Sequence, residues 1–215
     1  MKTILLKDAA ALIPDGATVM IGGFMGVGTP ERLVDELVRQ GKRNLTVIAN
    51  DNALPGVGIG KLISAGAVKK TIASHIGLNP ETQKKMLAGE LEVDLVPQGT
   101  LIERIRAGGF GLGGVLTPTG VGTVVEKGKQ RIEVQGKPYL LETALRADFA
   151  LVQAFLADYI GNLYYALTAR NFNPVIAMAA DTVIVEAENI VPVGVIAPDQ
   201  VVTPAPVVDY IISHA

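Results

Sequence analysis

The sequence contains no cysteine and no long uninterrupted apolar segment. Without cysteine, disulfides, thiolate zinc sites and a cysteine nucleophile are excluded. No stretch reaches the ~18 apolar residues that a membrane-spanning helix needs, and Asp181 interrupts the nearest candidate, VIAMAADTVIV. The first apolar run ends at Lys7 and Asp8, which is too early for the core of a signal peptide. We therefore expect a cytoplasmic protein that does not enter a membrane.

Charged residues are also scarce. Asp, Glu, Lys and Arg make up 19% of the 215 residues and the net charge is −2, so the chain has no basic surface for nucleic acid or an anionic membrane. The mean hydropathy of +0.37 is high for a soluble chain. Two explanations fit this value: strands that are buried on both faces of a parallel sheet, and surface that is covered by a partner chain.

Short apolar runs alternate with amphipathic segments through the first half of the chain. Thr29 suits an N-cap and Pro30 the first helical position, while Asn79-Pro80 and Thr100 mark further helix starts. The alternation predicts an α/β fold, an open mostly parallel sheet flanked by helices. The predicted strands are 18–22, 45–49, 70–74 and 91–96, and the predicted helices start at Thr29, near Lys61, at Asn79 and at Thr100.

The pattern changes after residue 107. Residues 108–122 include seven glycines, which predicts a loop. Residues 131–134 and 139–141, joined by Gln135-Gly136, predict an inserted β-hairpin. With no repeat and no linker, residues 1–215 are predicted to form a single domain. The remaining predicted elements are strands 149–155 and 182–186, a helix starting at Asn173-Pro174, and a proline-rich tail that crosses the surface.

The glycine-rich segment 22–28 is similar to phosphate-binding loops but matches none of them. It has the glycine spacing of a P-loop, but Thr29 and Pro30 replace the lysine and the Ser/Thr, so we reject nucleotide hydrolysis. Glu31 stands where a dinucleotide fingerprint needs its third glycine. Two interpretations stay open: a tight turn without a ligand, and a site at a helix start for an anion or for a narrow group such as a pantetheine arm.

The residue types alone give no complete catalytic set. His75 follows a strand and is either a general base or, as we favour, a hydrogen-bonded structural histidine. Asp51 either lines a site at the carboxyl end of a strand or caps a turn. His214 is expected to be inert, and no metal-ligand spacing occurs, so we expect no metal site. The chain looks like half of an active site.

The segment DGATVMIGGFMGVGTPERL resembles the N-terminal signature of class I coenzyme A transferases, with Gly22-Gly23-Phe24 as its Gly-Gly-Phe element and Gly28 and Pro30 completing the loop. The resemblance covers essentially the whole chain, and it is greatest to the α (A) subunits of bacterial acetate/butyrate–acetoacetate (3-oxoacid) CoA-transferases. The other similar segments are LTVIAND, TIASHIGLNPET, LVPQGTLIERIRAGGFGLGG, TPTGVGT and ARNFNP.

The resemblance implies an enzyme that exchanges CoA between a short-chain acyl-CoA (acetyl-, butyryl- or succinyl-CoA) and acetoacetate or a related acid through a glutamyl-CoA thioester. The glutamate belongs to a Ser-Glu-Asn-Gly motif of the family's β subunit. This sequence lacks the motif, since its only Glu-Asn pair, Glu188-Asn189, is followed by Ile190. No catalytic nucleophile is therefore expected in this chain, and CoA is a substrate rather than a permanent cofactor.

The resemblance also implies site residues and a partner. Gln98 is an auxiliary active-site residue that could stabilise an oxyanion, or else a strand-end residue bonded to the backbone, and Asn50 assists the glutamate. A β subunit is expected in an α2β2 heterotetramer, with the loop 108–122 either at the active-site edge of the interface or as a surface loop. The rival hypothesis is a non-catalytic sugar-phosphate sensor of the same fold. The CoA-binding residues are expected to be Gly22, Gly23, Phe24, Met25, Gly26, Val27 and Gly28.

Overall fold

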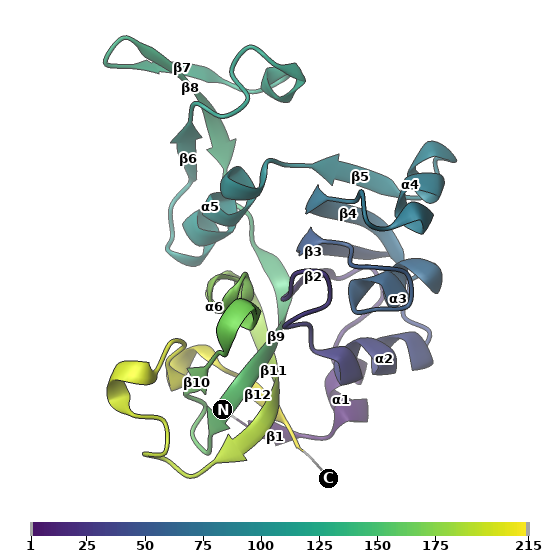
Figure 1. Ribbon diagram of the computed structural model, residues 1–215, viewed down its shortest axis with the longest axis vertical. Coiled ribbons are helices and arrows are strands. Elements are labelled where there is room, and N and C mark those ends of the chain that lie inside the picture. Colours follow the sequence, from purple (N-terminus) through teal and green to yellow (C-terminus); the bar gives the residue numbers. More distant parts are fainter. Residues whose placement is uncertain (1, 214–215) are drawn as a thin grey trace.

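The computed structural model describes residues 2–213, and a nine-stranded sheet runs through it (Figure 1). Every pairing in this sheet is parallel except that of β10 with β9. The prediction of an open, mostly parallel sheet is confirmed. The order is β1 (Lys2–Ile4), β12 (Tyr210–Ile212), β11 (Ala180–Val191), β9 (Ala147–Asp158), β2 (Thr18–Ile21), β3 (Leu45–Asp51), β4 (Val68–His75) and β5 (Glu92–Leu95), with β10 (Leu163–Tyr164) beside β9.

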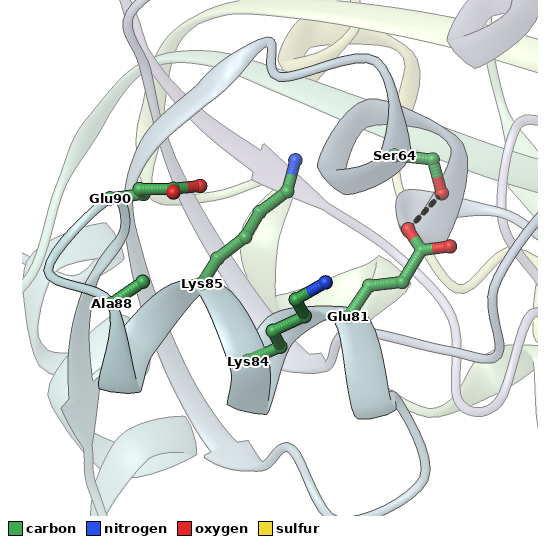
Figure 2. Close-up of a pocket in the computed structure, with 6 residues that line it drawn as sticks. All are labelled: Ser64, Glu81, Lys84, Lys85, Ala88 and Glu90. Carbon is green, nitrogen blue, oxygen red and sulfur yellow. Dashed lines mark hydrogen bonds between the residues drawn. The ribbon is translucent and has the colours of Figure 1, made fainter.

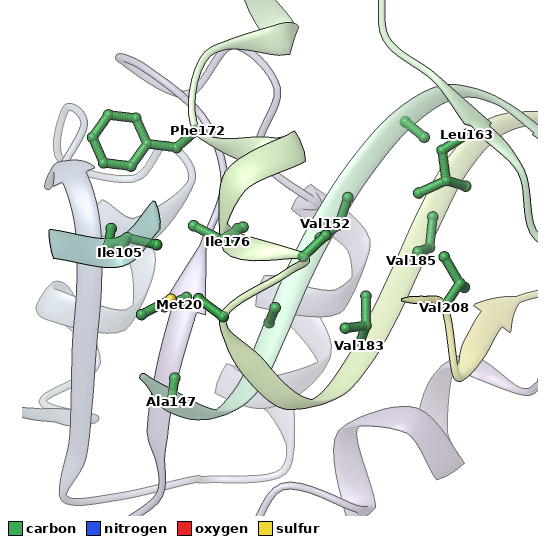
Figure 3. Packing of buried hydrophobic residues seen from close by; sticks show 14 of the residues in the cluster. Met20, Ile105, Ala147, Val152, Leu163, Phe172, Ile176, Val183, Val185 and Val208 are labelled. Carbon is green, nitrogen blue, oxygen red and sulfur yellow. The ribbon is translucent and has the colours of Figure 1, made fainter. Parts of the chain in front are cut away.

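Helices cover both faces of this sheet, because its central strands carry apolar side chains on both sides. On one face, α1 (Leu6–Ala11), α2 (Glu31–Arg39) and α3 (Ile59–Ser64) enclose one buried cluster, and α4 (Pro80–Leu87) packs beside α3. On the other face, α5 (Gln98–Gly109) and α6 (Asn173–Ile176) enclose a second cluster. Figure 3 shows Ile105 and Ile176 of these two helices near Met20 and Val152 of the sheet.

Two of the three predicted helix caps are wrong. Helix α2 has Pro30 as its N-cap, and the hydroxyl of Thr29 instead donates to the carbonyl of Gly22 at 3.1 Å. Helix α5 begins at Gln98 after Pro97, whose carbonyl accepts the first helical bond, so Thr100 lies inside the helix. Asn79 does cap α4, because its side chain accepts a hydrogen bond from the amide of Thr82.

The predicted hairpin is present and belongs to a separate three-stranded sheet, called here the arm, that projects from the main body (Figure 1). The prediction of a loop over 108–122 is wrong at the start and in the middle of the stretch, since α5 continues to Gly109 and β6 pairs with β8, and it holds over 118–122. Gly114 makes this pairing possible, because a Cβ there would lie 2.4 Å from the carbonyl oxygen of Glu142. The arm consists of β6 (Gly114–Thr117), β7 (Arg131–Val134) and β8 (Lys137–Thr143).

The two ends of the chain contribute elements that the sequence patterns did not predict. Strand β12 lies between β1 and β11, so the last described residues enter the main sheet instead of crossing the surface. Their apolar side chains, Ile211 and Ile212, are almost fully buried, which explains the pairing. The proline-rich segment before β12 does follow the surface and contains two short 3-10 helices. His214 lies outside the described residues.

Candidate active site

The residues singled out in the sequence meet at one edge of the main sheet. Gly22 follows β2, Asn50 and Asp51 end β3, His75 ends β4, and Gln98 opens α5 directly after β5. In parallel sheets, the carboxyl ends of the strands are where ligands bind. Because β2, β3, β4 and β5 are consecutive neighbours in the sheet, residues that are distant in the sequence come together at this edge.

The loop Gly22 to Gly28 forms a tight turn that is closed by its own backbone. Phe24 and Val27 exchange two N–H···O bonds of 2.9 Å each. Positive φ angles of 115° at Gly23, 90° at Gly26 and 82° at Gly28 require glycine at these positions. Within residues 2–213, the amides of these three glycines make no hydrogen bond; Gly26 and Gly28 are half-buried, whereas Gly23 is buried.

Asp51 supports this loop. Its buried carboxylate accepts hydrogen bonds from the amide of Met25 at 2.9 Å and from the amide of Ala53 at 2.6 Å. Met25 and Ala53 have φ angles of 52° and 51°, a region that costs energy for residues other than glycine. Asp51 therefore stabilises two strained turns at once, as the turn-capping interpretation expects.

Asn173 is a second support of the loop. The sequence pattern alone predicts it only as part of a helix start. It is fully buried, its Oδ1 accepts from the amide of Gln153 at 3.0 Å, and its Nδ2 donates to the carbonyls of Gly28 and Ala169 at 2.8 Å each. The side chain also packs against Gly22. The segment ARNFNP, quoted for its family resemblance, was the available signal for this residue.

The start of α2 already binds a carboxylate, which counts against the interpretation of this helix start as an anion site. Glu186 of β11 is 9% exposed and accepts from the amides of Leu33 at 2.8 Å and Arg32 at 3.2 Å. Burial raises the pKa of Glu186 above its ordinary value, although the two amides and the charge of Arg32 oppose the rise. The carboxylate of Glu186 thus compensates the positive end of the α2 helix dipole.

Replacing Glu186 by glutamine is expected to lower the free energy of unfolding at neutral pH by about 1 kcal/mol, since an NH₂ group takes the place of one of the two acceptor oxygens. The raised pKa means that the folded chain takes up this proton before the unfolded chain does. Stability of the wild type relative to the variant should therefore rise as the pH falls through the folded-state pKa, and level off below the ordinary glutamate value. Denaturant titrations of both proteins across this pH range measure the difference.

Glu133→Gln, at an exposed position of the arm, is the matched control for this experiment. Its free energy of unfolding at neutral pH should equal that of the wild type, because the side chain is exposed. A difference between wild type and Glu186→Gln that grows as the pH rises would contradict the raised pKa.

Gln98 and Asn50 are in direct contact. The Nε2 of Gln98 donates to the Oδ1 of Asn50 at 2.7 Å. Asn50 is 1% exposed, whereas Gln98 is exposed and faces solvent at the edge of the sheet. Among the described residues Gln98 makes no side-chain bond to the backbone. An exposed amide held by a buried one is suited to presenting an N–H to a developing oxyanion.

His75 is exposed at the end of β4, beside Asp51 in the strand register. Within the part of the chain that the structure describes, its ring forms no hydrogen bond, so the prediction of a hydrogen-bonded structural histidine is wrong.

No group of three or more potential metal-ligating residues occurs among residues 2–213. None of the helices described is long and apolar enough to cross a membrane.

The glycine loop carries exposed apolar side chains. Phe24, Met25 and Val27 at its tip are 39%, 40% and 53% exposed, and Leu54 and Val57 of the next loop are similarly accessible. Such a rim suits a narrow apolar group or a partner surface.

A separate hollow of about 400 Å³ lies between α3 and α4, where Ser64 donates a hydrogen bond to Glu81 (Figure 2). None of the candidate site residues lines this hollow.

Known proteins have a similar sequence or a similar fold over nearly the whole chain. Residues 3–214 match the family model described as Coenzyme A transferase. The chain is 59% identical over 98% of its length, and 96% of the relative's, to the acetate CoA-transferase subunit alpha of Escherichia coli (strain K12). It is 54% identical over 99% of its length, and 98% of the relative's, to the acetoacetyl-CoA:acetate/butyrate CoA transferase alpha subunit of Clostridium acetobutylicum.

A solved structure gives the same fold. An acyl-CoA transferase of E. coli O157:H7, determined as a thioester complex with CoA, aligns with a TM-score of 0.87 at 24% identity over 98% of this chain. This chain spans 46% of that solved chain, so it corresponds to somewhat less than half of it.

Proposed function

Because the chain belongs to the coenzyme A transferase family as an α subunit, we propose that it works in a heteromeric enzyme that moves CoA between a short-chain acyl-CoA and acetoacetate or a related acid. One observation carries the proposal: among residues 2–213, the site combines the amide pair of Gln98 and Asn50 with glycine amides that make no hydrogen bond, while the carboxylates beside the glycine loop are already engaged. Both oxygens of Asp51 accept hydrogen bonds from backbone amides, and Glu31 pairs with Lys61 and accepts from the amide of Gly58. We infer that the nucleophile comes from a partner.

The proposed reaction uses a glutamate of the partner β subunit. Its carboxylate attacks the thioester carbonyl of the acyl-CoA and expels the CoA thiolate, which leaves an acyl-glutamyl anhydride. The thiolate then attacks the glutamyl carbonyl, releases the acyl group as a carboxylate and leaves a glutamyl-CoA thioester. The incoming acid reverses these two steps and departs as the new thioester.

This chain would contribute positioning and charge stabilisation. The loop formed by Gly22, Gly23, Phe24, Met25, Gly26, Val27 and Gly28 would hold CoA, with its glycine amides bonding to polar atoms and its apolar rim contacting the pantetheine arm. Gln98, held by Asn50, would donate its second Nε2–H to the oxygen that becomes negative in each tetrahedral intermediate. CoA acts here as a substrate and leaves after each exchange.

We propose an α2β2 assembly in which residues 1–215 act as one unit. An obligate interface of this kind should bury roughly 2,000 Å² or more and be largely apolar. The apolar rim of the glycine loop and exposed side chains at the base of the arm, Phe110 and Leu112, are suited to such a contact. The arm would border the active site from the end of α5.

The sugar-phosphate sensor is the less favoured alternative. A phosphate at the start of α2 would have to displace the carboxylate of Glu186. The nearby amino group of Lys61 is also engaged, at 2.6 Å from Glu31 and 2.7 Å from Asp35. Neither the helix start nor this lysine is therefore free to bind a phosphate.

The test is to assay acetoacetyl-CoA formation by the chain alone and by the chain co-purified with a β subunit of the family. Activity is expected only in the mixture, and mass spectrometry after quenching with acyl-CoA should find CoA attached to the β subunit. A β subunit with the motif glutamate changed to glutamine is the control and should be inactive. Activity of this chain alone, or stabilisation by sugar phosphates and not by CoA in thermal melts, would contradict the proposal.

A further inference from the structure

Ser74, near the end of β4, forms hydrogen bonds to Asn50, one member of the amide pair of Gln98 and Asn50. Its hydroxyl lies 2.7 Å from the main-chain oxygen of Asn50 and 3.0 Å from the Oδ1 of the same residue. A serine hydroxyl has one proton, so it divides this donation between the two oxygens. Ser74 comes from a different strand than Asn50, and it belongs to neither the glycine loop nor the Gln98 helix.

Three side chains hold the amide of Asn50 in place. Its Oδ1 lies within hydrogen-bond distance of the hydroxyl of Ser74 and the Nε2 of Gln98, while its Nδ2 donates to the Oδ1 of Asn171 at 3.3 Å. A serine hydroxyl both donates and accepts, so Ser74 stays bonded to this amide. Ser74 therefore helps to fix where the Asn50 amide meets Gln98.

The orientation of Asn50 determines which group Gln98 offers to a ligand. With Oδ1 towards Gln98, the Nε2 of Gln98 bonds to Asn50 and is kept on that side, with its second hydrogen available. If Asn50 turned its Nδ2 to this side, Gln98 would have to present its Oε1 instead, and its amide would reverse. An oxyanion needs the N–H and is repelled by the oxygen.

We propose that Ser74 is a positioning residue for the transferase reaction, acting through Asn50 to hold the Gln98 amide in its place at the site. The inference rests on the proposed role of Gln98. Ser74 itself does not touch substrate. Its effect should therefore appear in kcat, with little change in the KM for acyl-CoA.

The test compares Ser74→Thr with Ser74→Val in the assembled enzyme, because the two side chains have the same shape and differ in the hydroxyl. Loss of one such hydrogen bond should lower kcat of Ser74→Val about tenfold relative to Ser74→Thr. Ser64→Ala is the control, since that hydroxyl also contacts two acceptors, Gly60 and Glu81, far from the amide pair. Its kcat should equal that of the wild type.

A double-mutant cycle with Gln98→Ala separates positioning from general destabilisation. If Ser74 acts through Gln98, Ser74→Val should have almost no further effect on kcat once Gln98 is alanine. Equal effects of Ser74→Val with and without Gln98 would overturn the inference, as would equal kcat for the Thr and Val variants. If Gln98→Ala itself leaves kcat unchanged, the proposed role of Gln98 fails as well.

Discussion

Replacing Gln98 by alanine is expected to lower kcat of the assembled enzyme about 100- to 1,000-fold, the usual cost of removing one oxyanion donor. The side chain is exposed, and among the described residues its hydrogen bond goes to Asn50, so the fold should persist. The KM for acyl-CoA should change little, because the interaction is made in the transition state. Steady-state kinetics with acyl-CoA and acetoacetate measure both values.

Two further variants complete this experiment: Gln98→Glu is a second test of the oxyanion role, and Gln40→Ala is the control. The glutamate has the shape of the glutamine but places negative charge where the oxyanion forms, so it should be at least as damaging as alanine. Gln40 is a half-buried glutamine at the end of α2 that bonds to Lys7 and Glu36, and its replacement should leave kcat unchanged. Full activity of Gln98→Ala would refute the oxyanion role.

Replacing Gly22 by alanine is expected to destabilise the protein by roughly 3–5 kcal/mol and to abolish activity, because overpacking and broken hydrogen bonds add together. A Cβ at this position would lie 1.8 Å from the Oδ1 and 2.4 Å from the Cγ of Asn173. Asn173 cannot move away without losing its bonds to Gln153, Gly28 and Ala169. Such a loss is a large part of the stability of a typical domain.

Denaturant titrations of Gly22→Ala and Gly113→Ala test this expectation. Nothing lies within 4 Å of a Cβ at Gly113, so that variant should have the midpoint of the wild type. Asn173→Ala should remove the obstacle, so Gly22→Ala should cost much less in that background than in the wild type. An unchanged midpoint for Gly22→Ala would show that the loop adapts and that the contact is not rigid.

The first half of the fold could be predicted because apolar runs report buried strands directly, as at β2, β3 and β4. Helix starts were less predictable, because Thr29 and Thr100 can both form caps, whereas α2 and α5 begin directly after Pro30 and Pro97. The pairing of β9 with β2 joins segments more than a hundred residues apart, and no local pattern encodes it.

The residues of the candidate site were also only partly predictable from the sequence. Gln98 and Asn50 were named from family resemblance, and their contact spans 48 positions that spacing alone could not relate. Asn173, which supports the glycine loop, and Glu186, which binds the start of α2, were missed because each lies about 150 positions beyond its partner and acts through buried bonds. Sequence motifs identified the residues that face the proposed ligand, and the structure identified those that hold them.

Two buried residues, Asn173 at the glycine loop and Glu186 at the start of α2, also constrain when this protein can become functional during its synthesis. Both are translated long after the segments that they hold, and β9 must be present before β2 has both neighbours. A nascent chain on the ribosome can form β3, β4 and β5 early, but the glycine loop lacks Asn173 until α6 has emerged, and the start of α2 lacks Glu186 until β11 has emerged. Contacts of such long sequence separation slow folding. The loop should therefore be among the last parts of the chain to reach its final conformation.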